Sequence, residues 1–200
     1  FPLIVVMPDG GRGFYVDAAQ GFRYGTAIGT ELPHRIERTF PAKQTRDGRT
    51  LAGLSMGGYG ALRLALTHPD RFCAAASLSG AVGWGHNPDD WTGSLYSPEF
   101  QRVLGENFIG GNADIWHLAT SLTPDERPAM RFDCGTGDFL FADNQAFDAF
   151  LTEHGITHEY VEHPGEHNWA YWDEHIEESL HFVLSAMNPE TATAPAISAD

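Results

Sequence analysis

The sequence predicts an α/β fold with a mostly parallel sheet and helices on both of its faces. Short apolar runs suited to buried strands alternate with longer segments of helical periodicity. The 200 residues, of which 42% are hydrophobic, suffice for one sizeable core. The predicted strands are residues 3–7, 50–54, 73–79, 129–135 and 158–163. The predicted helices are residues 57–68, 98–104 and 169–187, with another that begins near residue 144.

The segment around Ser55 predicts a sharp turn from a strand into a helix. Residues 50–54 (TLAGL) are short and apolar, and residues 57–68 (GGYGALRLALTH) carry leucines at near-helical spacing. Such a turn strains the serine and requires small neighbours, and we expect Gly53 and Gly57 to supply the room. In the α/β-hydrolase fold, this strand–turn–helix unit presents a nucleophile. The alternative is a glycine-rich turn with an incidental serine.

A serine nucleophile needs a base and an acid, and in this fold the acid and then the histidine follow the serine in the chain. Asp138 follows a predicted strand and a glycine turn, at the sheet edge where functional groups gather. We prefer it to Asp133, which lies within the strand pattern, and to Asp143, which suits the first turn of a helix. His167 lies in a loop after the last predicted strand, which is the place for the base.

The other nine histidines offer no equally good base. Five fall in or at the ends of helical patterns, where a solvated or C-terminal histidine is ordinary: His34, His68, His154, His175 and His181. Four have no assignable role: His86, His117, His158 and His163.

A zinc site is the rival interpretation of this region. Residues 163–167 (HPGEH) match the H-x-x-E-H of inverted zinc peptidases, which requires both histidines on one face of a helix. Pro164 and Gly165 disfavour that helix. The trio His154, His158 and His163 is a weak metal signal as well. We therefore expect no metal and no organic cofactor.

Four segments in this order resemble the esterase D-type branch of the α/β hydrolases: residues 53–72, 77–81, 134–144 and 164–176. That branch includes tributyrin-type esterases, S-formylglutathione hydrolases, feruloyl and acetylxylan esterases, and mycolyltransferases. Leu54 and Tyr59 look more like the tributyrin-type esterases. The resemblance runs from about Leu3 to Met187. It implies Ser55 as nucleophile, Asp138 as acid and His167 as base, and these are the residues that spacing selects.

The resemblance implies a serine carboxylesterase that acts on small or medium acyl esters through an acyl-enzyme. The alternatives are an acyltransferase or an S-formylglutathione-type thioesterase that uses the same three residues. One oxyanion donor is expected to be the backbone N–H of Met56, the residue after the nucleophile.

The second oxyanion donor is where the sequence departs from the family pattern. In the family, the second donor lies on a loop that follows an additional strand. This additional strand comes earlier in the sequence than the strand that residues 3–7 (LIVVM) resemble. In the family's sheet it lies between the strands that correspond to residues 3–7 and 50–54. We expect the sequence to be a fragment lacking these N-terminal strands, or the turn at Gly10 and Gly11 to serve instead. A non-catalytic ligand-binding remnant is the third possibility.

The charge of the sequence argues against two classes of partner and leaves small molecules as the expected one. The net charge of −15, with Lys43 as the single lysine, argues against binding nucleic acid or anionic membranes. No run reaches the length of a membrane span and no secretory signal is visible, so a cytoplasmic location is expected. Oligomeric state is left open.

We expect one domain over residues 1–188 and a disordered tail over residues 189–200. Within the domain, residues 82–128 form an aromatic-rich insertion over the active site, although these aromatic side chains also suit a small subcore. Tyr15, after the first strand, and Trp169, beside the base, are better placed to meet a substrate.

Overall fold

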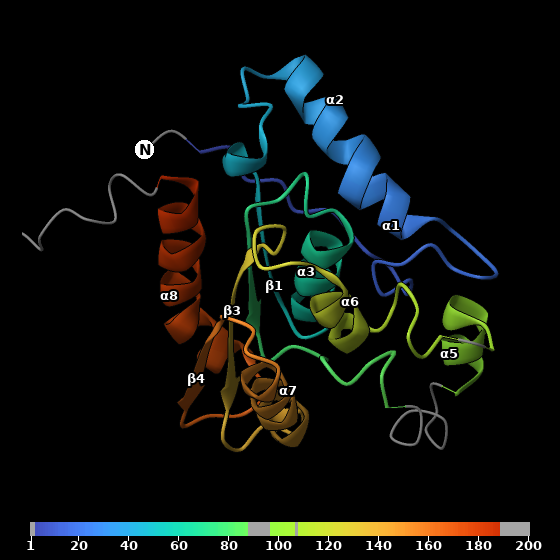
Figure 1. The fold of residues 1–200 in the computed structure, drawn as a ribbon, viewed down its shortest axis with the longest axis vertical. Coiled ribbons are helices and arrows are strands. Elements are labelled where there is room, and N and C mark those ends of the chain that lie inside the picture. Colours follow the sequence, from blue (N-terminus) through green and yellow to red (C-terminus); the bar gives the residue numbers. More distant parts are fainter. Residues whose placement is uncertain (1–2, 88–96, 107, 189–200) are drawn as a thin grey trace, which may run out of the picture.

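The computed structural model describes residues 3–87, 97–106 and 108–188 (Figure 1). Its strands are β1 (Thr50–Leu54), β2 (Ala74–Leu78), β3 (Ala129–Gly135) and β4 (Glu159–His163). The longer helices are α2 (Leu32–Thr39), α3 (Met56–Thr67), α5 (Ser97–Leu104), α6 (Ile115–Ser121), α7 (Phe141–Glu153) and α8 (Trp169–Met187). Shorter turns of helix are α1 (Tyr24–Thr26), η1 (Ala27–Glu31) and η2 (Arg46–Gly48).

The four strands form one parallel sheet in the order β1-β2-β3-β4. Parallel strands joined by helices leave all their carboxyl ends at the same edge. The loops that follow β1, β3 and β4 therefore meet there, although they are far apart in the sequence. This confirms the predicted fold class and brings three candidate site segments together.

Helices cover both faces of the sheet, with α8 on one and α3, α6 and α7 on the other (Figure 1). Side chains of β2 alternate between these layers, as the two-residue period of a strand requires. Ala75 packs into the cluster on the α3 side. Ala74 and Ala76 pack against Val183 of α8, and Leu78 packs against the first turns of the same helix.

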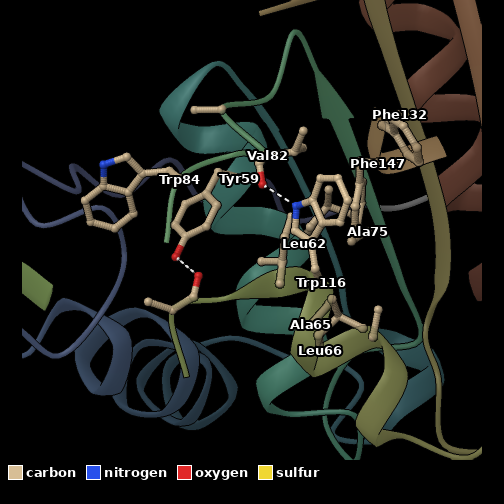
Figure 2. Close-up of a cluster of buried hydrophobic side chains, with 14 of the residues drawn as sticks. Tyr59, Leu62, Ala65, Leu66, Ala75, Val82, Trp84, Trp116, Phe132 and Phe147 are labelled. Carbon is tan, nitrogen blue, oxygen red and sulfur yellow. Dashed lines mark hydrogen bonds between the residues drawn. The ribbon is translucent and has the colours of Figure 1, made fainter. Parts of the chain in front are cut away.

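The main core lies between α3 and the segments that follow β2, and two of its aromatic side chains make buried hydrogen bonds (Figure 2). The hydroxyl of Tyr59 donates to the carbonyl of Ala113 at 2.6 Å. The indole N–H of Trp116 donates to the carbonyl of Val82 at 2.9 Å. The first bond joins α3 to the segment before α6, and the second joins α6 to the segment that follows β2.

Aromatic side chains of residues 82–128 fill this core wherever the structure describes them. Trp84, Phe100 and Trp116 are all buried, and Trp84 stacks on Phe14 with ring centroids 3.7 Å apart. Their surfaces are therefore used for packing, as the subcore interpretation expects. Trp91 and Tyr96 lie outside the described residues, as does the expected tail over 189–200. The predicted helix over 98–104 is confirmed by α5, whereas α6 was not anticipated.

The strand predicted over residues 3–7 is wrong. These residues form no ladder in the described structure, and Val5 and Met7 are 67% and 90% exposed. A strand is stabilised by hydrogen bonds to a neighbour, and β1 pairs only with β2 among the described strands. Residues 3–7 instead border a groove of about 510 Å³ whose other walls include α2 and β1. Without a neighbouring strand among the described residues, this apolar run thus lies outside the sheet and is exposed.

Two smaller differences concern the ends of elements. The helix predicted from Asn144 is α7, which begins three residues earlier at Phe141, so Asp143 lies in its first turn as expected. His175 was expected to be solvated, but it is only 8% exposed on α8. Its helical position is correct, and its burial comes from the packing of α8 against the sheet.

Candidate active site

Ser55 occupies a strained turn between β1 and α3. Its backbone has φ 54° and ψ −121°, a conformation that side-chain-bearing residues rarely adopt. The Ser55 N–H donates to the carbonyl of Leu78 at 2.8 Å, and the Ser55 carbonyl accepts from Tyr59 and Ala81. The strain is thus held by bonds to the neighbouring strand, to α3 and to the segment after β2.

The two glycines expected to make room for the turn do so differently. A Cβ on Gly53 would lie 2.3 Å from the backbone oxygen of Gly57, so no side chain fits there. A Cβ on Gly57 would meet only the hydroxyl of Tyr15 at an ordinary 3.6 Å. The prediction that the turn needs a glycine is therefore correct for Gly53 and wrong for Gly57. At Gly57 only the backbone matters, because it lies close to Gly53.

The structure brings Ser55, Asp138 and His167 together at the carboxyl edge of the sheet. Nε2 of His167 lies 2.9 Å from Oγ of Ser55, and Nδ1 lies 2.8 Å from Oδ2 of Asp138. With its proton on Nδ1, His167 donates to the carboxylate and accepts from the hydroxyl. The other oxygen of Asp138 accepts from the N–H of Leu140 at 2.8 Å, which fixes the carboxylate. The Asp138 side chain is fully buried, and that of His167 is 17% exposed.

The other two candidate acids lie elsewhere. Asp133 is buried within β3 and accepts a hydrogen bond from the hydroxyl of Tyr171 at 2.8 Å. Burial raises the pKa of Asp133 to about 6, against the lowering effects of Tyr171 and Arg131. Asp143 lies on α7, where it approaches Gly83. The hydrogen bond to His167 is made by Asp138 rather than by either of them.

Met56 is the first residue of α3, so its N–H has no acceptor within the helix and belongs to the positive end of the helix dipole. The turn at Gly10 and Gly11, considered as the second oxyanion donor, has other bonds. The Gly11 N–H donates to Oδ1 of Asp9 at 2.7 Å. The Gly10 carbonyl accepts from Gly13. Asp9 therefore already uses one of the two N–H groups of this turn.

Tyr15 lies against the first turns of α3. Its ring fills the space where a Cβ on Gly60 or Gly10 would stand. Burial, helped by Asp9, raises the pKa of its phenol, so the hydroxyl is a neutral donor at ordinary pH. The hydroxyl lies near Gly57, two residues from the serine.

Aromatic side chains surround His167. Trp172 of α8 meets it edge-on with ring centroids 4.9 Å apart, and Phe139 lies 4.6 Å away. Trp169 is 74% exposed and packs edge-on against Trp172. Phe139 is equally exposed and was missed by sequence reasoning. The signal in the sequence was that Phe139 directly follows Asp138, because the neighbours of a site residue lie at the same edge of the sheet.

His163 and His167 do not form the zinc pair of the rival interpretation. His163 ends β4, and the five residues that follow lead to α8 without a helix between the two histidines. His167 is bound to Ser55 and Asp138, whereas His163 stacks on His175. His154 and His158 also have separate hydrogen-bond partners, at Phe150 and Asp148.

The fold and the residues at this edge define an α/β hydrolase. A family model described as a putative esterase matches residues 2–183, and the chain belongs to this family. The resemblance to the esterase D-type branch is thereby confirmed.

Comparison with individual proteins agrees. The chain is 32% identical over 192 residues to an acetyl esterase of Caldicellulosiruptor saccharolyticus, covering 92% of this chain and 72% of the relative. It is 30% identical over 226 residues to the esterase Rv1288 of Mycobacterium tuberculosis, covering all of this chain and 48% of that protein. The substrate-bound structure of FphF, a fluorophosphonate-binding serine hydrolase of Staphylococcus aureus, aligns with a TM-score of 0.75 at 27% identity, over 86% of this chain and 68% of that one. Within the described residues, no helix is both long and apolar enough to cross a membrane.

Proposed function

We propose that this chain is a serine carboxylesterase in which Ser55 is the nucleophile, His167 the base and Asp138 the orienting acid. The observation that carries the proposal is the continuous pair of hydrogen bonds from Ser55 through His167 to Asp138, at 2.9 and 2.8 Å. Membership of the esterase family and the acetyl esterase relative support an ester substrate.

The reaction follows from the positions of these groups. His167 Nε2 takes the hydroxyl proton while Oγ of Ser55 forms a bond to the ester carbonyl carbon. Asp138 holds the imidazole and stabilises its charged form. The tetrahedral intermediate expels the alcohol, which receives the proton from His167, and an acyl-enzyme remains. Water then gives a proton to His167, attacks the acyl carbon and releases the acid, regenerating Ser55.

The N–H of Met56 supplies one hydrogen bond to the oxyanion in this proposal, since it lies at the N-terminus of α3 beside the nucleophile. We assign the second donor to no residue of the chain. The backbone hydrogen bonds of Ser55 to Leu78, Tyr59 and Ala81 keep the serine at the start of α3, where attack and oxyanion binding take place in this proposal.

Tyr15 and Trp169 are proposed to contact the substrate, together with Phe139. Trp169 and Phe139 expose apolar rings beside His167, which suits the acyl or alcohol part of a small ester. Truncation of Trp169 or Phe139 to alanine is expected to raise KM more than it lowers kcat, because these rings contact the substrate and take no part in proton transfer.

The test is hydrolysis of p-nitrophenyl acetate and butyrate by the parent chain, by Ser55→Ala and by Ser121→Ala. Ser121 is an exposed serine of α6 whose hydroxyl bonds only to its own helix, so it is the matched control. We expect Ser55→Ala alone to lose activity, with a pre-steady-state burst of p-nitrophenol in the parent. An acyltransferase would instead form a new ester when an alcohol is added. Equal activity in all three proteins, or a folded but inactive parent, contradicts the esterase.

A further inference from the structure

A cluster of three potential metal ligands lies between the end of β4 and α8, away from Ser55. His163 is the last residue of β4, and His175 and Glu178 lie one turn apart on the same side of α8. One ligand atom from each residue lies within 4.8 Å of the other two. The two imidazole rings stack with centroids 3.9 Å apart and planes 9° from parallel.

The distances within this cluster are long for hydrogen bonds. Nε2 of His163 lies 3.5 Å from Oε2 of Glu178, and Nδ1 of His175 lies 3.7 Å from Oε1. Two ligands bound tetrahedrally to zinc at about 2.0–2.1 Å are separated by about 3.4 Å. These two nitrogen–oxygen distances therefore match the spacing of two ligands on one metal ion better than that of a hydrogen-bond donor and acceptor.

The His163 Nε2 atom is the second sign of a missing partner. It is buried and makes no hydrogen bond to any described residue. A buried polar atom without a partner is costly and calls for an explanation. Here the unpaired nitrogen belongs to the same three-residue group, and a metal ion held by the three residues would satisfy it.

The surrounding charge suits a dication. Arg131 of β3 contacts both Glu159 and Glu178, so these two carboxylates exceed its single positive charge by one.

We propose that His163, His175 and Glu178 form a binding site for Zn²⁺, with solvent as the fourth ligand. Two imidazoles and one carboxylate are a donor set that Zn²⁺ prefers. The site joins the end of β4 to α8, and the chain between them carries His167. It is independent of the catalytic proposal, because none of its ligands contacts Ser55 or Asp138 in the described structure.

The test is metal titration of the whole chain after removal of metals with EDTA. Calorimetry with Zn²⁺ gives stoichiometry and affinity, and Co²⁺ absorption reports tetrahedral coordination. We expect one tight equivalent in the parent and in Ser55→Ala, together with a higher Tm when Zn²⁺ is added. His175→Gln and His163→Gln are expected to weaken binding at least about a hundredfold, since even outer-shell changes cost ten- to a hundredfold.

Matched controls lie on the same helix. His181 and Glu177 are both exposed on α8, so His181→Gln and Glu177→Gln should bind Zn²⁺ as the parent does. Glu178→Gln should lose it, with circular dichroism in EDTA to confirm that each variant is folded. The proposal is overturned if the parent binds no equivalent, if the two ligand histidine variants retain full affinity, or if the controls lose affinity equally. Esterase activity enters none of these readouts, so its absence would leave the metal result unaffected.

Discussion

Residues 50–54, which lead to Ser55, and residues 3–7 are both apolar in sequence, yet only the first segment forms a strand in the described structure. At the carboxyl edge, Ser55 is held by bonds to β2 and α3, and it meets His167 and Asp138 at hydrogen-bond distance. Residues 3–7 form no ladder, and Met7 is 90% exposed. The difference teaches that an apolar run becomes a strand only when another strand pairs with it. The serine turn, in contrast, is largely specified by its own glycines and by the strand beside it.

The largest effect should come from removing the charge that orients His167. Asp138→Asn is expected to lower kcat by about 10³–10⁴, because an amide favours the wrong imidazole tautomer and cannot stabilise the imidazolium. Asp143→Asn, which changes the acid in the first turn of α7, should leave kcat within a few-fold. The measurement is steady-state hydrolysis of p-nitrophenyl acetate. Equal losses in the two variants would show that Asp138 has no special role.

The close packing at the serine turn can be broken by one methyl group. Gly53→Ala should reduce the free energy of unfolding by about 3 kcal/mol or more, since its Cβ would meet backbone 2.3 Å away. Gly57→Ala should change it by no more than about 1 kcal/mol, because that Cβ has room and alanine favours a helix. Urea unfolding of both variants checks the pair. A tolerated Gly53→Ala would contradict the described turn.

The buried carboxyl group of Asp133 should make stability depend on pH. Its pKa in the folded chain is about 6, above the ordinary 3.8, so the folded state keeps a proton that the unfolded state has lost between those values. The stability given by the neutral acid is therefore complete below about pH 4 and is lost as pH rises through 6, by about 3 kcal/mol in total.

Asp133→Asn removes this titration and serves as the check. Its free energy of unfolding relative to the parent should increase from pH 4.5 to pH 7.5, measured by denaturant titration in the presence of EDTA. A difference that stays constant across this range would mean that Asp133 ionises normally in the folded chain.

The smallest effect is expected in residues 3–7. Met7→Ser and Val5→Thr should each change the free energy of unfolding by less than about 0.5 kcal/mol, as exposed substitutions usually do. Leu62→Ala, at a fully buried position of α3, should cost about 2–5 kcal/mol. Urea unfolding again gives both values. A large loss on changing Met7 would show that this segment is packed in solution.

Sequence reasoning succeeded where structure is set locally. The strand and helix around Ser55 and the acid loop after β3 each carry their own signals in glycine spacing and apolar runs. It failed where the outcome depends on distant partners. Residues 3–7 have the composition of a strand but no neighbouring strand in the part of the chain that the structure describes. His175 has the sequence setting of a surface residue but is covered by the sheet. Phe139 could be placed beside His167 only once both loops were known to meet.

The most direct test of the central claim is reaction with a fluorophosphonate, followed by intact-mass measurement and peptide mapping. This reagent class is bound by the structurally similar hydrolase FphF. We predict one adduct per chain, located on Ser55, formed much more slowly in His167→Gln and absent in Ser55→Ala. An adduct on another residue, or none in the folded parent, would contradict the assignment of Ser55 as an activated nucleophile.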